Sequence, residues 1–389
     1  MAQGKGDWYH IKFLESTENL KGLLGDSSQR EISTGLANDI SVCLQQGRSF
    51  FELSELSPPE IRPLQLYYGM VGFAKAVALV RSLKRLDTLN RTHGLSDVSD
   101  PKGSIENFTL KFNACGTFQA MNDSIRVLEK IHVHKRDEVK TVLKPTCSSD
   151  ALMGKEISLK SVLGRIPHLE AQYEETFREP AKVVHCSHFE VEVGEGRNWI
   201  VFTTHHYNLP RGKKEFEQFL SDLRKKLPFL NEWCLVSAKW FDGAASIVFA
   251  NIDRNETSEF RGEELFEIGQ GYETKNAAAV YDKDSTNEDI TKKIGPISGN
   301  LMRGDTWIIE PHQDLTLSEM SLYYCGMFIL SSLVRYHPSV WANALAKRAR
   351  LNEQVDDKAF PLIESFINLT TIRFPAMVAN GIKEPFSTV

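Results

Sequence analysis

Two short basic segments carry the side chains of this chain that are best suited to binding a charged ligand. Arg91-Thr92-His93 and Arg335-Tyr336-His337 each follow an apolar stretch that contains two adjacent tyrosines. Arginine presents a fork of N–H donors and histidine titrates near neutral pH, so together they suit a phosphate or a nucleotide. If the two stretches pack side by side, the four Arg and His side chains form one basic pocket, and we take them as candidate ligand-binding residues. The alternative for Arg335 and His337 is a structural role, because positive charge is favourable at a helix C-terminus.

Lys75 is a fifth candidate ligand-binding residue, because it lies in an apolar stretch. Its neighbours include Phe73, Ala74 and Val77. An ammonium group in such a stretch must extend to solvent, pair with a carboxylate or contact an anion. All three alternatives stay open, and the third would add a cation to the pocket.

The tyrosine pairs Tyr67–Tyr68 and Tyr323–Tyr324 admit two interpretations. They could stack on a flat ligand, or they could pack between helices with their hydroxyls at the interface. Neighbouring residues of a helix point about 100° apart, so only one tyrosine of each pair can face a given partner helix.

Signatures of catalysis and of metal binding are absent from the sequence. It contains no Gly-x-Ser-x-Gly, no Cys-x-x-Cys and no His-Glu-x-x-His spacing. His132 and His134 would share one face of a strand, whereas His185 and His188 would point to opposite faces. We therefore predict no metal and no cofactor, and whether the protein is an enzyme stays open.

Composition and charge are those of an ordinary soluble globular protein. The 389 residues are 41% hydrophobic and 25% charged, and the net charge of −5 gives no general attraction to nucleic acid. The six cysteines are scattered, which is typical of reduced thiols, and the polar N-terminus does not resemble a signal peptide. The longest apolar run, 320–334, is too short to span a bilayer. We expect a cytoplasmic protein without a membrane partner.

Helices at both ends of the chain must position the candidate residues. One apolar helix, expected over 60–86, contains Leu66-Tyr67-Tyr68-Gly69-Met70, and another, expected over 318–336, contains Leu322-Tyr323-Tyr324-Cys325-Gly326-Met327. Both stretches contain few charges, so both helices should be buried on most sides. We predict that these two helices contact each other in one helical body.

The middle of the chain has strand patterns instead. Gly194-Glu195-Gly196 and Asp242-Gly243 each lie between apolar runs of strand length, which predicts two hairpins in a mostly antiparallel sheet within 105–251. We expect an α+β fold in three parts: a helical part over 1–100, an inserted α+β region over 101–305, and a second helical part over 306–389 that packs on the first.

Several strings of residues at the two ends of the chain resemble the YaaC-like bacterial proteins. The N-terminal strings are Gln46-Gly47-Arg48-Ser49-Phe50-Phe51-Glu52, Arg62-Pro63-Leu64-Gln65-Leu66-Tyr67-Tyr68-Gly69 and His93-Gly94-Leu95. The C-terminal strings are Leu333-Val334-Arg335-Tyr336-His337-Pro338-Ser339-Val340-Trp341, Pro361-Leu362-Ile363 and Phe374-Pro375. The resemblance covers both helical ends and is weak through the middle. It implies a bacterial cytoplasmic protein, and it brings no catalytic motif with it.

Three functions stay open on these grounds. The first is a non-catalytic interaction or accessory subunit of a bacterial complex, with a protein partner or a second copy of the chain. An antiviral defence complex is one such setting. The second is a sensor of a nucleotide or small anion at the Arg and His residues. The third is a nucleic-acid hydrolase, against which the sequence argues, because the Arg–His spacing typical of helical ribonuclease-like domains is missing. We place the accessory subunit first because catalytic motifs are absent.

Overall fold

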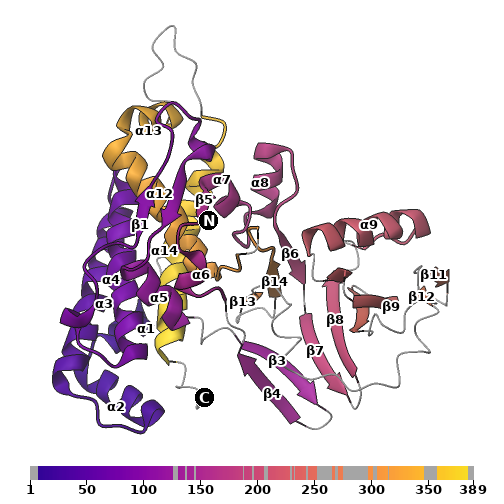
Figure 1. Ribbon diagram of the computed structural model, residues 1–389, viewed down its shortest axis with the longest axis horizontal. Helices are drawn as coiled ribbons and strands as arrows, with labels where there is room; N and C mark the ends of the chain where they lie inside the picture. The colour runs from indigo at the N-terminus through magenta and orange to yellow at the C-terminus, as the bar shows by residue number, and fades with distance from the viewer. Residues whose placement is uncertain are drawn as a thin grey trace. The chain divides into compact units, whose positions relative to one another are not determined.

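The computed structural model describes most of the chain as two compact units, shown as ribbons in Figure 1. The helical unit contains the described residues of 1–128, 146–181 and 312–389, and the sheet unit contains those of 129–145 and 182–311. The described residues are 8–125, 130–135, 138–143, 146–186, 188–194, 197–205, 209–227, 230–231, 233–241, 244–251, 265–267, 270–274, 297–300, 305–313, 315–345 and 357–383.

The helical unit is built from helices at both ends of the chain. The first part of the chain contributes α1 (Tyr9–Leu14), α2 (Thr17–Ser28), α3 (Thr34–Glu55), α4 (Arg62–Ser82), α5 (Thr117–Ile125), α6 (Ser149–Leu152), α7 (Leu159–Leu163) and α8 (Glu170–Phe177). The last part contributes α12 (Glu319–Tyr336), α13 (Pro338–Ala344) and α14 (Phe360–Lys383). An antiparallel sheet in the order β1-β2-β5 accompanies them, with β1 at Leu95–Asp97, β2 at Thr109–Phe112 and β5 at Glu156–Ser158.

α4 is a buried helix of this unit. Pro63 lies in its first turn, where the missing N–H breaks no helical bond, and Leu83 ends it in a left-handed conformation. Between Leu66 and Val80, only Tyr68 and Lys75 are not buried. α4 is also the one described helix whose length and composition would allow it to cross a membrane, but 78% of the relevant segment is buried inside the protein.

α3 and α4 pack closely because glycines line their contact. A Cβ atom at Gly72 would lie 2.9 Å from the carbonyl oxygen of Cys43 and 3.0 Å from the backbone nitrogen of Gly47. A Cβ at Gly69 would lie 2.9 Å from the carbonyl oxygen of Gly47. The two backbones therefore touch where the side chains are missing, and the register of these contacts makes the helices antiparallel, side by side in Figure 1.

α12 packs against α4, which is the contact predicted from the matching Leu-Tyr-Tyr sequences. The side chain of Ser318 caps α12 by accepting the N–H of Ser321 at 3.0 Å. The ring centroids of Tyr67 and Tyr324 lie 5.5 Å apart, nearly perpendicular to one another. Tyr323 points elsewhere and stacks on Phe366 of α14. The prediction that the two Tyr-rich helices contact each other is confirmed.

The sheet unit contains an eight-stranded sheet in the order β11-β12-β9-β10-β8-β7-β3-β4 and a three-stranded sheet in the order β13-β14-β6. Every described ladder is antiparallel except the one between β3 and β7. The strands of the larger sheet are β3 (Lys130–Lys135), β4 (Glu138–Leu143), β7 (His188–Gly194), β8 (Arg197–His205), β9 (Trp233–Phe241), β10 (Ala244–Asn251), β11 (Leu265–Glu267) and β12 (Gly271–Thr274). The strands of the smaller sheet are β6 (Val183–Cys186), β13 (Ile297–Asn300) and β14 (Asp305–Ile309).

One amphipathic helix, α9 (Lys213–Lys226), covers part of the larger sheet. Phe216, Leu220 and Leu223 are the buried residues of α9. They belong to one apolar cluster with sheet residues such as Leu235 and Phe249. The basic residues at both ends of α9 therefore lie on a helix whose opposite side is fixed to the sheet.

The α+β fold and the antiparallel middle are as predicted. β7 pairs with β8 and β9 with β10, which are the two predicted hairpins, although the turn residues 195–196 and 242–243 lie outside the described residues. The compact units divide the chain at other positions than the expected limits of 100 and 305. The described residues of 101–125 and 146–181 belong to the helical unit, because β2 pairs with β1, α5 packs on α4 and α7 packs on α12.

Candidate functional site

Two of the five predicted ligand-binding residues, His93 and Arg335, lie against one buried ring, that of Tyr67. The His93 ring centroid is 5.5 Å from that of Tyr67, and the guanidinium carbon of Arg335 is 5.8 Å from the same ring. Lys75 lies two turns further along α4, and its positive charge is the smallest of the causes that lower the pKa of His93. We call Tyr67, Lys75, His93 and Arg335 the Tyr67 cluster.

The loop that carries His93 is held by the first turn of α5. The N–H of Thr117 donates to the carbonyl of Thr92 at 2.9 Å, and the N–H of Phe118 donates to the carbonyl of His93 at 3.1 Å. Gly94 follows at φ +83°, and a Cβ there would collide with the Gln119 side chain. The helix N-terminus thus finds its acceptors in this loop, and the loop is fixed with the His93 ring against Tyr67.

Arg335 lies in the last turn of α12, and part of its side chain binds its own helix. Nε donates to the carbonyl of Ser331 at 3.2 Å, and Nη2 reaches the hydroxyl of the same residue at 3.4 Å. The guanidinium also lies 4.8 Å from the ring centroid of Tyr336. The structural role considered from the sequence is therefore present, but it leaves Nη1 without a hydrogen-bond partner among the described residues.

Donor atoms of the Tyr67 cluster remain unused. Within the described part of the chain, the Lys75 ammonium and both ring nitrogens of His93 have no hydrogen-bond or ion-pair partner, and like Arg335 Nη1 they are not sealed from solvent. All three side chains are only partly buried. Each of the three side chains therefore has a free nitrogen to offer to a ligand.

The electrostatics of the Tyr67 cluster are those of uncompensated positive charge. Burial lowers the pKa of His93, and the charges of Arg335 and Lys75 lower it further. No carboxylate contributes to this shift among the described groups. The imidazole is consequently neutral at neutral pH, and a negative ligand would be attracted to the two permanent cations.

The hydroxyls beneath the cluster are buried. Those of Tyr67 and Tyr324 approach one another, yet neither has a partner of ordinary hydrogen-bond geometry among the described residues. Burial raises the pKa of both phenols. Tyr324, Phe328, Ser331 and Arg335 follow one face of α12 at helical spacing, which places them along Tyr67. This spacing is visible in the sequence and would have identified Ser331 as the residue that holds Arg335.

The other two predicted residues lie elsewhere. His337 Nε2 is 3.1 Å from Asp97 Oδ2 of β1, and its ring packs edge-on against Phe108. Arg91 is exposed, and no hydrogen bond or ion pair links it to the Tyr67 cluster in the described residues. The structure thus brings His93 and Arg335 together at Tyr67, places Lys75 two turns along the same helix as Tyr67, and gives His337 a structural partner.

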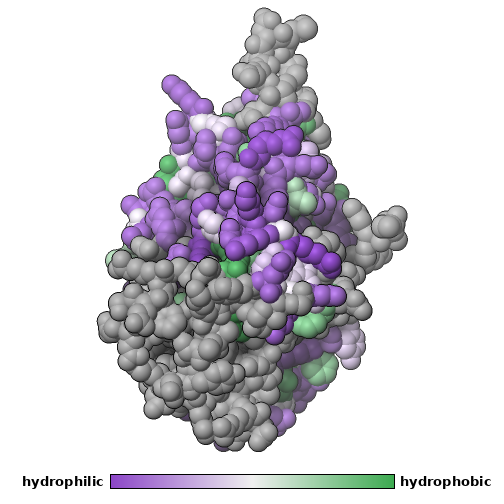
Figure 2. Space-filling view, turned by 90° about the vertical axis from the view of Figure 1, so that its right-hand side faces the viewer, coloured by the Kyte–Doolittle hydropathy of each residue, from purple (hydrophilic) through white to green (hydrophobic). Residues whose placement is uncertain are grey.

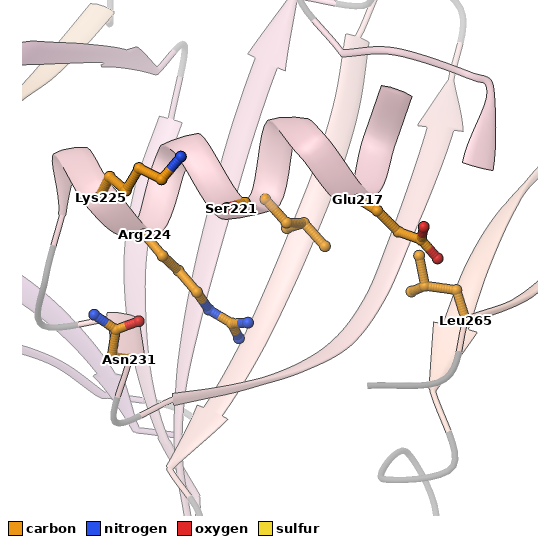
Figure 3. A pocket seen from close by; sticks show the side chains of 7 residues that line it. Glu217, Ser221, Arg224, Lys225, Asn231 and Leu265 are labelled. Carbon is orange, nitrogen blue, oxygen red and sulfur yellow. The ribbon is translucent and has the colours of Figure 1, made fainter. Parts of the chain in front are cut away.

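A second candidate site is a shallow depression on the sheet unit (Figure 3). It has a volume of about 430 Å³, and its lining residues are Glu217, Leu220, Ser221, Arg224, Lys225, Asn231 and Leu265. Glu217 and Arg224 put opposite charges on the same side of α9, so the lining favours no one charge of ligand. On the face of the molecule seen in Figure 2, hydrophilic colours predominate among the described residues.

Metal chemistry finds no support in the described residues. They contain no group of three or more His, Cys, Asp or Glu side chains that could hold a metal ion. His185 lies on β6 with its ring 4.7 Å from that of Trp307, whereas His188 begins β7 in the other sheet. His132 and His134 occupy alternate positions of β3, as expected from the strand period.

Comparison with known proteins points to one family. A family model described as YaaC-like Protein matches residues 12–382, nearly the whole chain. No curated protein and no solved structure matches the chain. The match extends through the middle, where the resemblance of individual residues is weak. The chain belongs to the YaaC-like family.

Proposed function

We propose that the protein is a non-catalytic binding protein for a small phosphate-bearing anion, which it holds at the Tyr67 cluster. The observation that carries the proposal is that His93 and Arg335 lie against the same Tyr67 ring, with free donors and without a carboxylate partner among the described residues, while the charge of Lys75 acts on His93. Partly buried charges normally pair, because desolvation of an unpaired charge is costly. A bound anion would compensate these cations.

The position of the Tyr67 cluster gives the ligand a structural effect. Tyr67 and Lys75 belong to α4, Arg335 belongs to α12, and His93 belongs to the loop held by α5. One anion that binds Lys75, Arg335 and the neutral His93 ring would connect the two ends of the chain. Binding should therefore stabilise the helical unit, as expected for a ligand that binds the folded state only.

The test is calorimetric titration with inorganic phosphate and pyrophosphate, supported by thermal unfolding. Arg335→Gln removes one charge-assisted contact, which is worth about 1.5–3 kcal/mol, so the Kd should rise about tenfold or more. Arg91→Gln is the matched control: it removes an arginine two residues from His93 that makes no contact with the cluster, and binding should persist. Absence of binding by the unaltered protein, or equal effects of the two substitutions, would overturn the proposal.

An accessory-subunit function remains a second candidate, and one surface feature supports it. Leu53 and Leu56 at the end of α3, and Ile61 just before α4, have exposed fractions of 51%, 87% and 42%. Exposed apolar side chains that gather on one surface are typical of sites that bind another protein, and these three lie close together in the sequence. If they form an interface between copies of the chain, Leu56→Ser should lower the molar mass measured by light scattering. An unchanged mass would speak against self-association through this surface.

A further inference from the structure

We infer that the ligand of the Tyr67 cluster is a nucleoside monophosphate, whose phosphate binds Arg335 and whose base stacks on Tyr336; this inference rests on the function proposed above. The aromatic surroundings of Arg335 motivate it. Its guanidinium lies 5.8 Å from the buried ring of Tyr67 and 4.8 Å from the ring of Tyr336. The Tyr67 ring is buried and the Tyr336 ring is exposed.

Tyr336 is available to a ligand in a way that Tyr67 is not. Its side chain is 64% exposed, whereas Tyr67 is fully buried. The face of an exposed aromatic ring is poorly hydrated. A nucleic-acid base can therefore stack on it, and a neighbouring basic group can bind the phosphate of the same ligand. Tyr68, at 36% exposure and with its ring 6.0 Å from that of Tyr67, adds a second aromatic surface on the α4 side.

The charge of the cluster selects a phosphate monoester. Lys75 and Arg335 carry one positive charge each, and His93 is neutral near pH 7 because its pKa is lowered. A phosphate monoester carries a charge of about −1.5 to −2 at this pH. The two cations therefore match one monoester group, while His93 can donate or accept a hydrogen bond according to its tautomer.

The described contacts also separate the roles of the residues. Arg335 serves both parts of the ligand, because its guanidinium lies near the Tyr67 ring of the cluster and also near the Tyr336 ring. Tyr336 is assigned to the base alone. Stacking on an aromatic face needs no particular pattern of hydrogen bonds, so any base should be accepted. A sugar phosphate without a base should thus bind, but more weakly.

The experiment compares AMP with ribose 5-phosphate by calorimetric titration of the full chain. AMP should bind about five- to 150-fold more tightly, the range expected for stacking of one base. Tyr336→Ala should abolish this ratio; because Tyr336 also contacts Arg335, the ratio of the two affinities is the readout, and not either affinity alone. The control is Tyr9→Ala, which removes another exposed tyrosine, 66% exposed, on α1 of the same unit.

The outcomes separate this inference from the proposed function. Equal affinities for AMP and ribose 5-phosphate would overturn the nucleotide inference and leave the phosphate site standing. A ratio that survives in Tyr336→Ala would overturn the assignment of the base to that ring. If neither compound binds, and inorganic phosphate does not bind either, the proposed function itself fails. Circular dichroism of each variant checks that it is folded.

Discussion

Replacement of Gly72 by alanine tests whether the close contact of α3 and α4 is what the fold requires. A Cβ atom there would lie 2.9 Å from the carbonyl oxygen of Cys43, 3.0 Å from the nitrogen of Gly47 and 3.2 Å from its Cα. All three atoms belong to the α3 backbone, so no side chain can rotate away. The helices would have to separate, and α4 carries Tyr67 and Lys75 of the candidate site.

The size of the effect follows from two opposing contributions. Alanine is favoured over glycine inside a helix by about 1 kcal/mol. Overpacking of a tight contact costs about 1–3 kcal/mol, and the rigid backbone neighbours place Gly72→Ala at the upper end. We expect a net loss of about 2 kcal/mol in the free energy of unfolding, from about 3 kcal/mol of packing cost less the gain in helix propensity.

Gly22→Ala supplies the matched control, because it makes the same chemical change without the contact. Gly22 lies inside α2, and a Cβ there would meet nothing within 4 Å. This variant should gain about 0.5–1 kcal/mol from helix propensity alone. Urea unfolding followed by far-UV circular dichroism compares the two variants with the unaltered protein. If Gly72→Ala stabilises the protein as much as Gly22→Ala does, the helices do not pack through their backbones and the reasoning is refuted.

Three further substitutions probe polar groups of the helical unit that are buried or partly buried. His93 has a folded-state pKa below its unfolded value of 6.5, so stability should fall as pH drops below about 6.5. His93→Gln should flatten that decline in urea unfolding measured at several pH values; equal slopes would contradict the assignment. Glu319 contacts Arg373 through both oxygens, at 2.7 and 3.0 Å. Glu319→Gln should lower the free energy of unfolding by about 3–5 kcal/mol, because the largely buried Arg373 guanidinium loses its ion-pair partner. The same change at the more exposed Glu52 should lower it by less than about 1 kcal/mol. Tyr67→Phe should leave stability unchanged or raise it by up to about 1 kcal/mol, because the hydroxyl lacks a well-formed hydrogen bond; a clear loss in calorimetry would show that the bond exists.

The parts of the fold that could be predicted are those with a long, regular pattern. The two apolar Tyr-rich helices had to bury nearly all of their surface, and each offered the other a matching partner. The hairpins followed from turn residues between strand-length runs. The small sheet of the helical unit could not be assigned in this way, because β1 and β5 have only three residues each. Strands this short carry no period, and their pairing depends on contacts far apart in the sequence.

The site was predictable in residue type but only partly in geometry. Arg91 and His93 lie two residues apart in a loop, and one is exposed while the other packs on Tyr67. A loop has no repeating geometry from which this difference could be read. His337 follows an arginine by two residues, as His93 does. It nevertheless pairs with Asp97, whose position depends on the pairing of β1 with β2. The symmetry of the two basic segments in the sequence is therefore not a symmetry of the structure.

Arg335 shows why a helix cap and a ligand-binding residue are not exclusive alternatives. A lysine at this position could also favour the end of α12 through its charge. It could not hold the Ser331 carbonyl with one nitrogen, lie near the Tyr67 and Tyr336 rings and still present a second nitrogen to an anion, as Arg335 does with Nη1. The contact with Ser331 fixes the guanidinium in place, so the donor that remains is already oriented before a ligand arrives. Arg335→Lys should consequently keep most of the stability of α12 and still lose affinity for phosphate in the calorimetric titration. A lysine variant that binds phosphate as well as the unaltered protein would show that charge alone, and not the planar fork, makes the site.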